Sequence, residues 1–157
     1  MTVLRMLTMA IVLLIAMEVP PSANECDAGC RAERIEACFE RLSAVYRRGS
    51  TTDDVDRLFD LFAPDVRYVH AAYDADFAHA AWREAFLANL TRGAYDKGDD
   101  ELIEVTQVIH GRRHAAVEYR YVRRASDGTL QPADDQGGLL VLFAFEGDRI
   151  VLIEEYW

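Results

Sequence analysis

The chain has 157 residues, of which 51% are hydrophobic and 10% aromatic, and its net charge is −10. This length and composition indicate one globular domain with a hydrophobic core, and they exclude an intrinsically disordered protein. No basic stripe offsets the acidic charge, which argues against nucleic acid and anionic membrane surfaces as partners.

The first 23 residues have the layout of a signal peptide. After Arg5, the run Met6–Met17 contains no charged side chain, and it is shorter than the roughly 20 residues that span a bilayer. Pro20 and Pro21 then break the helix, and small residues follow. We predict a signal peptide over residues 1–23, a linker over 24–32 and a folded domain over 33–157. The protein is then secreted or periplasmic, with no membrane contact after cleavage, and an uncleaved membrane anchor is the alternative.

Three cysteines follow the signal segment. Cys30 and Cys38 are eight residues apart on one predicted helix, roughly 12 Å in rise, which is too far for a disulfide. A Cys26–Cys30 bridge is feasible if Cys26 lies beyond the helix end, and Cys38 is then a buried thiol. The sequence leaves open whether this bridge forms. No histidine lies at ligand spacing from the cysteines, so we expect no zinc site.

The domain begins with two predicted amphipathic helices. From Ala28 to Arg48, apolar residues recur every three or four positions, and Gly49 ends the pattern. Thr51 caps a second helix with Asp54 three residues later, and Pro64 ends that helix. The apolar positions are Ile35, Cys38, Phe39, Leu42, Val45 and Tyr46 in the first helix, and Val55, Leu58, Phe59 and Phe62 in the second.

The remaining chain is one helix and five strands. Residues 66–70 alternate as a strand, and a third helix follows, capped by Asp74 or Asp76 and ended by Gly93. Its apolar face holds Trp82, Ala85, Phe86, Asn89 and Leu90. Four strands come next, over Leu102–Ile109, His114–Arg123, Leu139–Phe145 and residues 149–157. Because the third of these is apolar on both faces, we predict that it is central. Helices on one side of an antiparallel meander make an α+β fold.

Three short motifs resemble one known family. They are Leu61–Val66 (LFAPDV), Trp82–Phe86 (WREAF) and the ending that runs from Arg149-Ile150 to Tyr156-Trp157. From roughly Glu33 to Trp157 the chain resembles the nuclear transport factor 2-like (NTF2-like) superfamily, in its SnoaL-like and ketosteroid-isomerase-like branch. This resemblance implies a cone-shaped curved antiparallel sheet wrapped on three helices, with a ligand pocket between them. The superfamily includes isomerases, cyclases, dehydratases, carriers and non-catalytic proteins, so the motifs do not select a reaction.

The isomerase residues of that branch do not carry over to this chain. The carboxylate base of the branch corresponds here to His70, and its tyrosine donor corresponds to Leu42. Its protonated aspartic acid corresponds to Val141 or a neighbour. Because both expected donors to an enolate oxygen are missing, we do not expect steroid isomerisation.

His70 is the candidate catalytic residue, with Tyr68 beside it on the same strand face. An imidazole exchanges a proton near neutral pH. A carboxylate or second histidine that orients His70 would complete a dyad. The candidates are Glu118, Glu155 and His110, on strands whose facing the sequence does not settle. The alternative is a structural histidine at a strand end, hydrogen-bonded to backbone.

A set of aromatic residues either fills the core or lines an apolar pocket with a few polar donors. We predict the pocket, with a small apolar or aromatic ligand. Its predicted lining residues are Tyr46, Tyr68, His70, Trp82, Tyr119, Tyr121, Phe143 and Trp157. We expect no cofactor and no metal, because the histidines lack ligand spacing.

Three functions remain open. The first is an exported module that binds a small molecule, with His70 at the pocket mouth. The second is a lyase, isomerase or hydrolase in which His70 is the general acid or base and Tyr68 or Tyr46 polarises the substrate. The third is a non-catalytic homodimerisation domain that uses an apolar outer sheet face.

Overall fold

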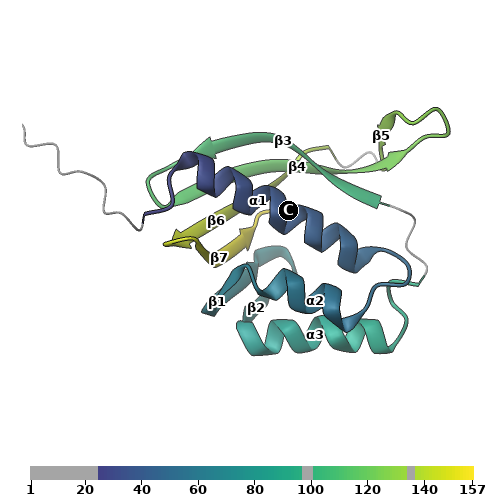
Figure 1. The fold of residues 1–157 in the computed structure, drawn as a ribbon, viewed down its shortest axis with the longest axis horizontal. Coiled ribbons are helices and arrows are strands. Elements are labelled where there is room, and N and C mark those ends of the chain that lie inside the picture. The colour runs from purple at the N-terminus through teal and green to yellow at the C-terminus, as the bar shows by residue number, and fades with distance from the viewer. Residues whose placement is uncertain (1–24, 97–100, 134–136) are drawn as a thin grey trace, which may run out of the picture.

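The computed structural model describes residues 25–96, 101–133 and 137–157, and in these ranges it contains three α-helices and one curved mixed sheet (Figure 1). In chain order the elements are α1 (Ala28–Tyr46), α2 (Thr52–Phe59), β1 (Phe62–His70), the 3-10 helix η1 (Ala71–Tyr73), β2 (Ala75–Ala78), α3 (His79–Thr91), β3 (Glu101–His110), β4 (His114–Arg124), β5 (Leu130–Pro132), β6 (Leu139–Glu146) and β7 (Arg149–Glu155). None of the described helices is both long and apolar enough to cross a membrane.

The sheet is mixed, which corrects the predicted antiparallel sheet. Its strand order is β2-β1-β7-β6-β4-β3, with β5 paired to β4. Strands β3, β4, β6 and β7 form the expected antiparallel meander, and β6 is central, as predicted. Strand β1, however, pairs parallel to β7. Parallel pairing needs a long connection between the two strands, and here β2, α3 and the strands β3 to β6 provide it.

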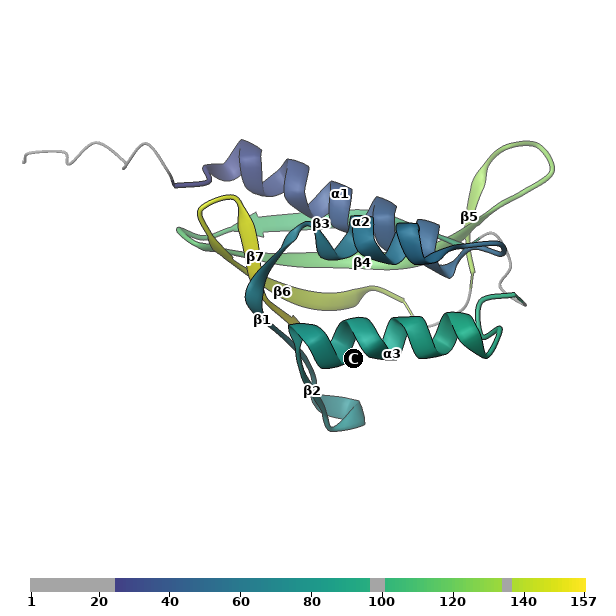
Figure 2. The same ribbon diagram turned by 60° about the horizontal axis from the view of Figure 1, so that its bottom comes forward.

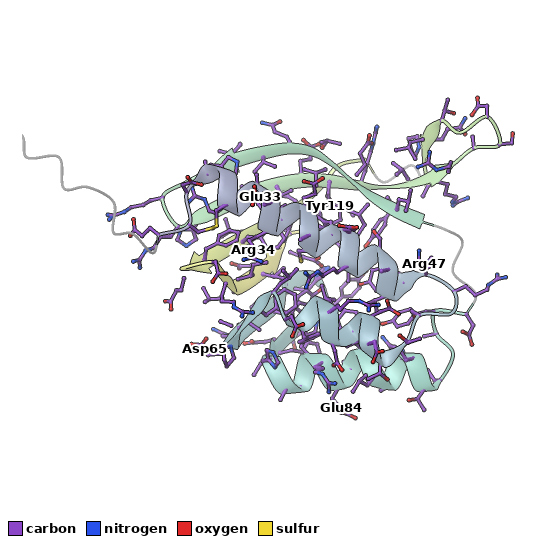
Figure 3. All side chains as sticks on the ribbon, in the orientation of Figure 1. Glu33, Arg34, Arg47, Asp65, Glu84 and Tyr119 are labelled. Atoms are coloured by element: carbon purple, nitrogen blue, oxygen red, sulfur yellow. A yellow bond between two sulfur atoms is a disulfide. The ribbon has the colours of Figure 1, made fainter. Side chains whose placement is uncertain are left out.

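The helices cover one face of this sheet. Helix α1 packs across β3, and α3 packs against β1 and β2 (Figure 2). Tyr119 of β4 lies between the sheet and α1 (Figure 3), with its ring centroid 4.9 Å from that of Phe39. The core therefore lies between the inner face of the sheet and the helices.

The opposite, outer face of the sheet is less apolar. It exposes Ile109 and Leu140, with 61% and 45% of their surface accessible. The strand partner of Leu140 is Glu118, a charged residue that is also exposed. Dimerisation through this face stays a prediction.

Helix α1 begins with a capped turn. The Asp27 carboxylate accepts a hydrogen bond of 2.9 Å from the backbone N–H of Cys30, which satisfies one of the free N–H groups at a helix start. The helix therefore starts at Ala28, so residues 28–32 of the predicted linker are helical. It ends at Tyr46, two residues before the predicted Arg48.

The second helix is shorter than predicted. Its capping box is confirmed, because the Asp54 carboxylate accepts the Thr51 backbone N–H at 2.8 Å. The helix ends at Phe59, however, and β1 already begins at Phe62, so Pro64 lies in a strand. The strand pairing with β7 is irregular between Phe62 and Arg67. A proline is tolerated there because an irregular stretch does not need its missing N–H.

The segment before α3 is also different from the prediction. Neither Asp74 nor Asp76 caps the helix, which begins at His79. Asp74 has a left-handed backbone (φ 50°) that ends η1. Asp76 lies on β2 and pairs with the guanidinium of Arg67 on β1. A strand of four residues is too short for its alternation to stand out in the sequence.

A disulfide closes the N-terminal end of the described chain. Cys26 and Cys30 are bridged, which settles the open question, and Cys38 is a buried free thiol. Burial raises the pKa of this thiol to about 12. Arg31, buried beside the bridge, donates from Nη1 to the backbone carbonyl of Arg112 at 3.1 Å. This contact ties the start of α1 to the β3–β4 turn.

Removing the disulfide should destabilise the fold modestly. The bridged residues are four apart in sequence, and so short a loop constrains the unfolded chain by only about 2 kcal/mol. We expect Cys26→Ser/Cys30→Ser to lower the free energy of unfolding by about that amount, measured by urea denaturation. The wild type in reductant is the control and should match the variant. Equal stabilities of the variant and the oxidised wild type would contradict this prediction.

Candidate functional site

A cavity of about 290 Å³ lies between the helices and the inner face of the sheet. Seven of the eight predicted ligand-binding residues line it, namely Tyr46, Tyr68, His70, Trp82, Tyr121, Phe143 and Trp157. The exception is Tyr119, which lies behind the wall. The wall is mostly aromatic and aliphatic, and its polar groups are few. Most small-molecule pockets have this constitution.

Strand register brings His70 and Glu155 together. His70 ends β1, Glu155 ends β7, and the two residues are direct partners in the parallel ladder. Since neighbouring strands lie about 4.8 Å apart, both side chains enter the same end of the cavity. The His70 Nε2 atom is 3.6 Å from Oε2 of Glu155. Of the three predicted partners for His70, Glu155 is therefore the one that the structure places beside it. Glu118 and His110 are exposed on β4 and β3.

Two tyrosines hold the Glu155 carboxylate. The Tyr68 hydroxyl donates to Oε2 at 2.8 Å, and the Tyr119 hydroxyl donates to Oε1 at 3.3 Å. Trp157 in turn donates from Nε1 to the Tyr119 oxygen at 2.9 Å. Each carboxylate oxygen thus accepts one hydrogen bond. Tyr68, predicted as a catalytic residue, is placed to orient the Glu155 carboxylate. Tyr119 holds the other carboxylate oxygen, although Tyr119 itself does not line the cavity.

Burial governs the protonation of this cluster. Burial raises the pKa of Glu155 above its ordinary value, and the hydrogen bond from Tyr68 and the nearby His70 oppose that rise. Burial and the Glu155 charge together raise the pKa of Tyr68 and of Tyr119. Both tyrosines therefore stay protonated and can keep donating to the carboxylate.

His70 is buried, and its predicted place at the pocket mouth stays a prediction. Only 2% of its surface is accessible, because Tyr73 and Trp157 cover it, with ring centroids at 4.4 and 4.5 Å. Neither ring nitrogen has a hydrogen-bond partner among the described residues. The alternative of a histidine bonded to backbone is therefore not what the structure shows.

The cavity also contains a polar pair that the sequence did not indicate. Asn89 of α3 donates from Nδ2 to the hydroxyl of Tyr95 at 3.0 Å, and both residues line the cavity. The helical period alone places Asn89 on the apolar face of the third predicted helix. Tyr95 follows α3 in an irregular segment, where no periodic pattern marks a residue as facing inward.

The resemblance assigned Leu42, and Val141 or a neighbour, to the donor positions of ketosteroid isomerases. Leu42 of α1 and Val141 of β6 both line the cavity. Neither side chain can donate to a developing oxyanion. Within residues 25–96, 101–133 and 137–157, no three histidine, cysteine or acidic side chains come close enough to hold a metal ion.

Comparison with solved structures identifies the architecture. An NTF2-like protein of unknown function from Burkholderia pseudomallei superposes with a TM-score of 0.54 at 14% identity, covering 82% of this chain and 90% of that one. A hypothetical protein with a ketosteroid isomerase-like fold from Catenulispora acidiphila, in complex with trimethylamine, superposes with a TM-score of 0.52 at 16% identity. The superposition covers 80% of this chain and 85% of that one. SalBIII is an epoxide hydrolase/cyclase-like enzyme with a role in pyran ring formation in the polyether salinomycin. It superposes with a TM-score of 0.57 at 18% identity, covering 83% of this chain and 92% of that one.

The fold is NTF2-like. The NTF2-like fold expected from three sequence motifs is thus confirmed by the arrangement of the helices and the sheet. No family model and no curated protein sequence matches the chain. At these identities the likeness establishes the NTF2-like fold alone, and function has to be argued from the pocket.

The buried Glu155 should leave a signature in the pH dependence of stability. Its folded pKa lies above the ordinary 4.5, so the folded state binds the proton more tightly than the unfolded state does. Its contribution to the free energy of unfolding is present in acid and is lost as the pH rises from about 4.5 through the raised pKa. The loss is about 1.4 kcal/mol for each pH unit by which the folded pKa exceeds the unfolded one. We expect Glu155→Gln to abolish this loss.

The comparison is best made in a His70→Gln background, which removes the imidazole beside Glu155. Urea denaturation from about pH 4 to about pH 8 then gives the difference between His70→Gln and His70→Gln/Glu155→Gln. This difference should decline as the pH rises. Glu146→Gln, at an exposed position of β6, is the matched control. A difference that stays constant over the whole range would show that burial does not raise the pKa of Glu155.

Proposed function

We propose that the NTF2-like pocket binds a compact, mostly apolar or aromatic molecule through a hydrogen bond to His70. The observation that carries this proposal is the buried imidazole, which lines an aromatic cavity and whose two nitrogens make no hydrogen bond to any described residue. A buried polar group without a partner costs about 1–3 kcal/mol. A ligand with one polar group recovers that energy by bonding to His70. The trimethylamine complex of the Catenulispora protein is a precedent for a small ligand in this fold.

The size of the cavity limits the ligand. At about 290 Å³ it is at the lower end of the roughly 300–1,000 Å³ of small-molecule sites. A molecule of one or two rings fits this space. The ligand class is therefore a small aromatic or alicyclic compound with few polar groups.

Export is the second part of the proposal. The uncharged run Met6–Met17 supports it, but these residues lie outside the described part of the chain. The Cys26–Cys30 disulfide also supports it, because disulfides persist in oxidising compartments and are rare in the cytosol. We infer a secreted or periplasmic protein.

Binding can be tested with 2-naphthol, a two-ring probe with one hydroxyl group. Isothermal titration calorimetry should show saturable binding to the wild type. His70→Ala should weaken it about tenfold, the equivalent of one hydrogen bond. His110→Ala, at an exposed position, is the control and should bind like the wild type. Absence of binding to the wild type, or equal loss in both variants, would contradict the proposal.

We propose acid–base catalysis as a second function of the same pocket, because a carboxylate faces the imidazole. Glu155 lies 3.6 Å from His70 Nε2 and is fixed by two tyrosines. Such contacts are often long in unliganded sites and shorten when substrate binds. Glu155 would orient His70 and stabilise the imidazolium that forms when His70 takes a proton. SalBIII is an enzyme precedent in this fold.

Tyr46 suits the role of substrate polariser better than Tyr68 does. The Tyr68 hydroxyl is engaged by Glu155. Tyr46 lines the cavity from α1, and burial raises the pKa of Tyr46 well above its ordinary value. Its hydroxyl therefore keeps its proton and is able to donate a hydrogen bond to a substrate oxygen. Proton abstraction or elimination reactions of lyases and isomerases fit this set of groups.

A generic proton-transfer substrate tests this function. In 5-nitrobenzisoxazole, removal of the C3 proton breaks the N–O bond and yields a coloured cyanophenolate. The imidazole takes the proton, and the oxygen leaves with the electron pair. We expect kcat/KM to fall at least about 100-fold in His70→Ala, the usual contribution of a general base. Glu155→Gln should give an intermediate rate and His110→Ala the wild-type rate. Equal rates for wild type and His70→Ala would exclude a general base at this position.

A further inference from the structure

The cavity has a second polar end, formed by Asn89 and Tyr95. Both side chains line the cavity and are partly buried, and their one hydrogen bond runs from Asn89 Nδ2 to the Tyr95 hydroxyl. No hydrogen bond joins this pair to the cluster around His70 and Glu155 within the described residues. The two ends are thus independent groups of donors and acceptors.

The Asn89–Tyr95 pair has unused hydrogen-bonding capacity. The Tyr95 oxygen accepts from Asn89, so its own hydrogen still lacks an acceptor among the described residues, and the Asn89 carbonyl oxygen lacks a donor. Turning the amide over would exchange these roles and would again leave one donor and one acceptor side by side. Burial also raises the pKa of Tyr95, which keeps its hydroxyl protonated. A hydroxyl or amide group of a ligand matches such a pair.

The spacing along α3 separates the two ends. Trp82, Phe86 and Asn89 lie on one face of the helix, and seven residues from Trp82 to Asn89 correspond to about 10 Å of rise. Trp82 stacks on Tyr68, with centroids at 4.7 Å, and Tyr68 belongs to the His70–Glu155 end. Helix α3 runs away from β1 and β2 toward its C-terminal end (Figure 2). The second pair therefore lies roughly 10 Å further along the helix.

An aromatic wall connects the two ends. The Phe86 ring lies 5.8 Å from Trp82 and 6.2 Å from Tyr46, and Tyr46 lies 5.5 Å from Tyr95. All four residues line the cavity. Flat rings pack well against such a wall, so the space between the polar ends is shaped for an aromatic body.

We propose that the ligand is an elongated two-ring aromatic molecule with a polar group at each end, and that Asn89 and Tyr95 bind the group opposite His70. This inference rests on the proposed function, because it assigns a ligand class to the same cavity. Asn89 and Tyr95 then determine specificity and take no part in proton transfer. The alternative is that the Asn89–Tyr95 hydrogen bond only holds the segment after α3 in place. Substitution of either residue would then not change the affinity for one ligand relative to another.

Two probes that differ by one hydroxyl group separate these roles. The diol 2,6-dihydroxynaphthalene carries hydroxyls at opposite ends of its rings, and 2-naphthol carries only one. By isothermal titration calorimetry we expect the diol to bind the wild type about tenfold more tightly than 2-naphthol, because it alone reaches both ends. In Tyr95→Phe, which keeps the ring, and in Asn89→Leu, this ratio should fall to about one.

The controls make the outcomes distinct. Tyr156→Phe removes a hydroxyl from an exposed tyrosine outside the cavity and should keep the tenfold ratio. Urea denaturation of Tyr95→Phe checks that the fold is intact. If 2-naphthol binds the wild type but the diol binds no better, or if Tyr95→Phe keeps the tenfold ratio, the second polar end is refuted alone. If neither probe binds the wild type, both this inference and the proposed function are overturned.

Discussion

The parallel pairing of β1 with β7 is the constraint on which the site depends. It joins two strands that lie far apart in the sequence, and its register places His70 beside Glu155 and Tyr68 beside Ile153. Because strand side chains alternate between faces, a slip of one residue would turn His70 to the outer face of the sheet. The irregular stretch around Pro64 precedes this register. The exposed Ala71–Tyr73 turn follows it and contributes the ring that covers His70.

The same register forces the fold to bury a carboxylate. A buried carboxylate is unfavourable unless it is hydrogen-bonded, and Tyr68 and Tyr119 supply one bond to each oxygen. Trp157 extends this network behind the cavity wall. The tyrosines therefore have a double role, since they offset the penalty of burying Glu155 and fix its orientation toward His70. Leu42 and Val141 add apolar surface to the cavity wall between these polar groups.

Sequence patterns predicted the helices and strands of this fold better than they predicted which strands pair and which side chains meet. Periodicity placed the stripe of α1, the Thr51–Asp54 capping box and the meander of β3, β4, β6 and β7. It missed the early start of β1 because the apolar residues Phe59 and Phe62 fit a helix as well as a strand. Alternation shows which residues share a face but not which strand lies next to it. The choice of Glu155 over Glu118, and the approach of Tyr95 to Asn89, therefore needed the tertiary structure.

The unpartnered imidazole is the strongest sign that the cavity has a use. Within the described residues, the buried side-chain atoms without a hydrogen-bond partner are Arg31 Nε, Ser50 Oγ and both nitrogens of His70. Arg31 donates through another nitrogen, and Ser50 lies in the turn between α1 and α2. Among these described residues, only His70 has no side-chain hydrogen bond at any polar atom while it also lines a cavity. A core selected for stability alone would favour an apolar residue at this position, since an apolar side chain of similar shape avoids the penalty of an unsatisfied polar group. This buried histidine, next to a carboxylate held by two tyrosines, is therefore the physical basis of our proposal that a bound molecule completes its hydrogen bonds.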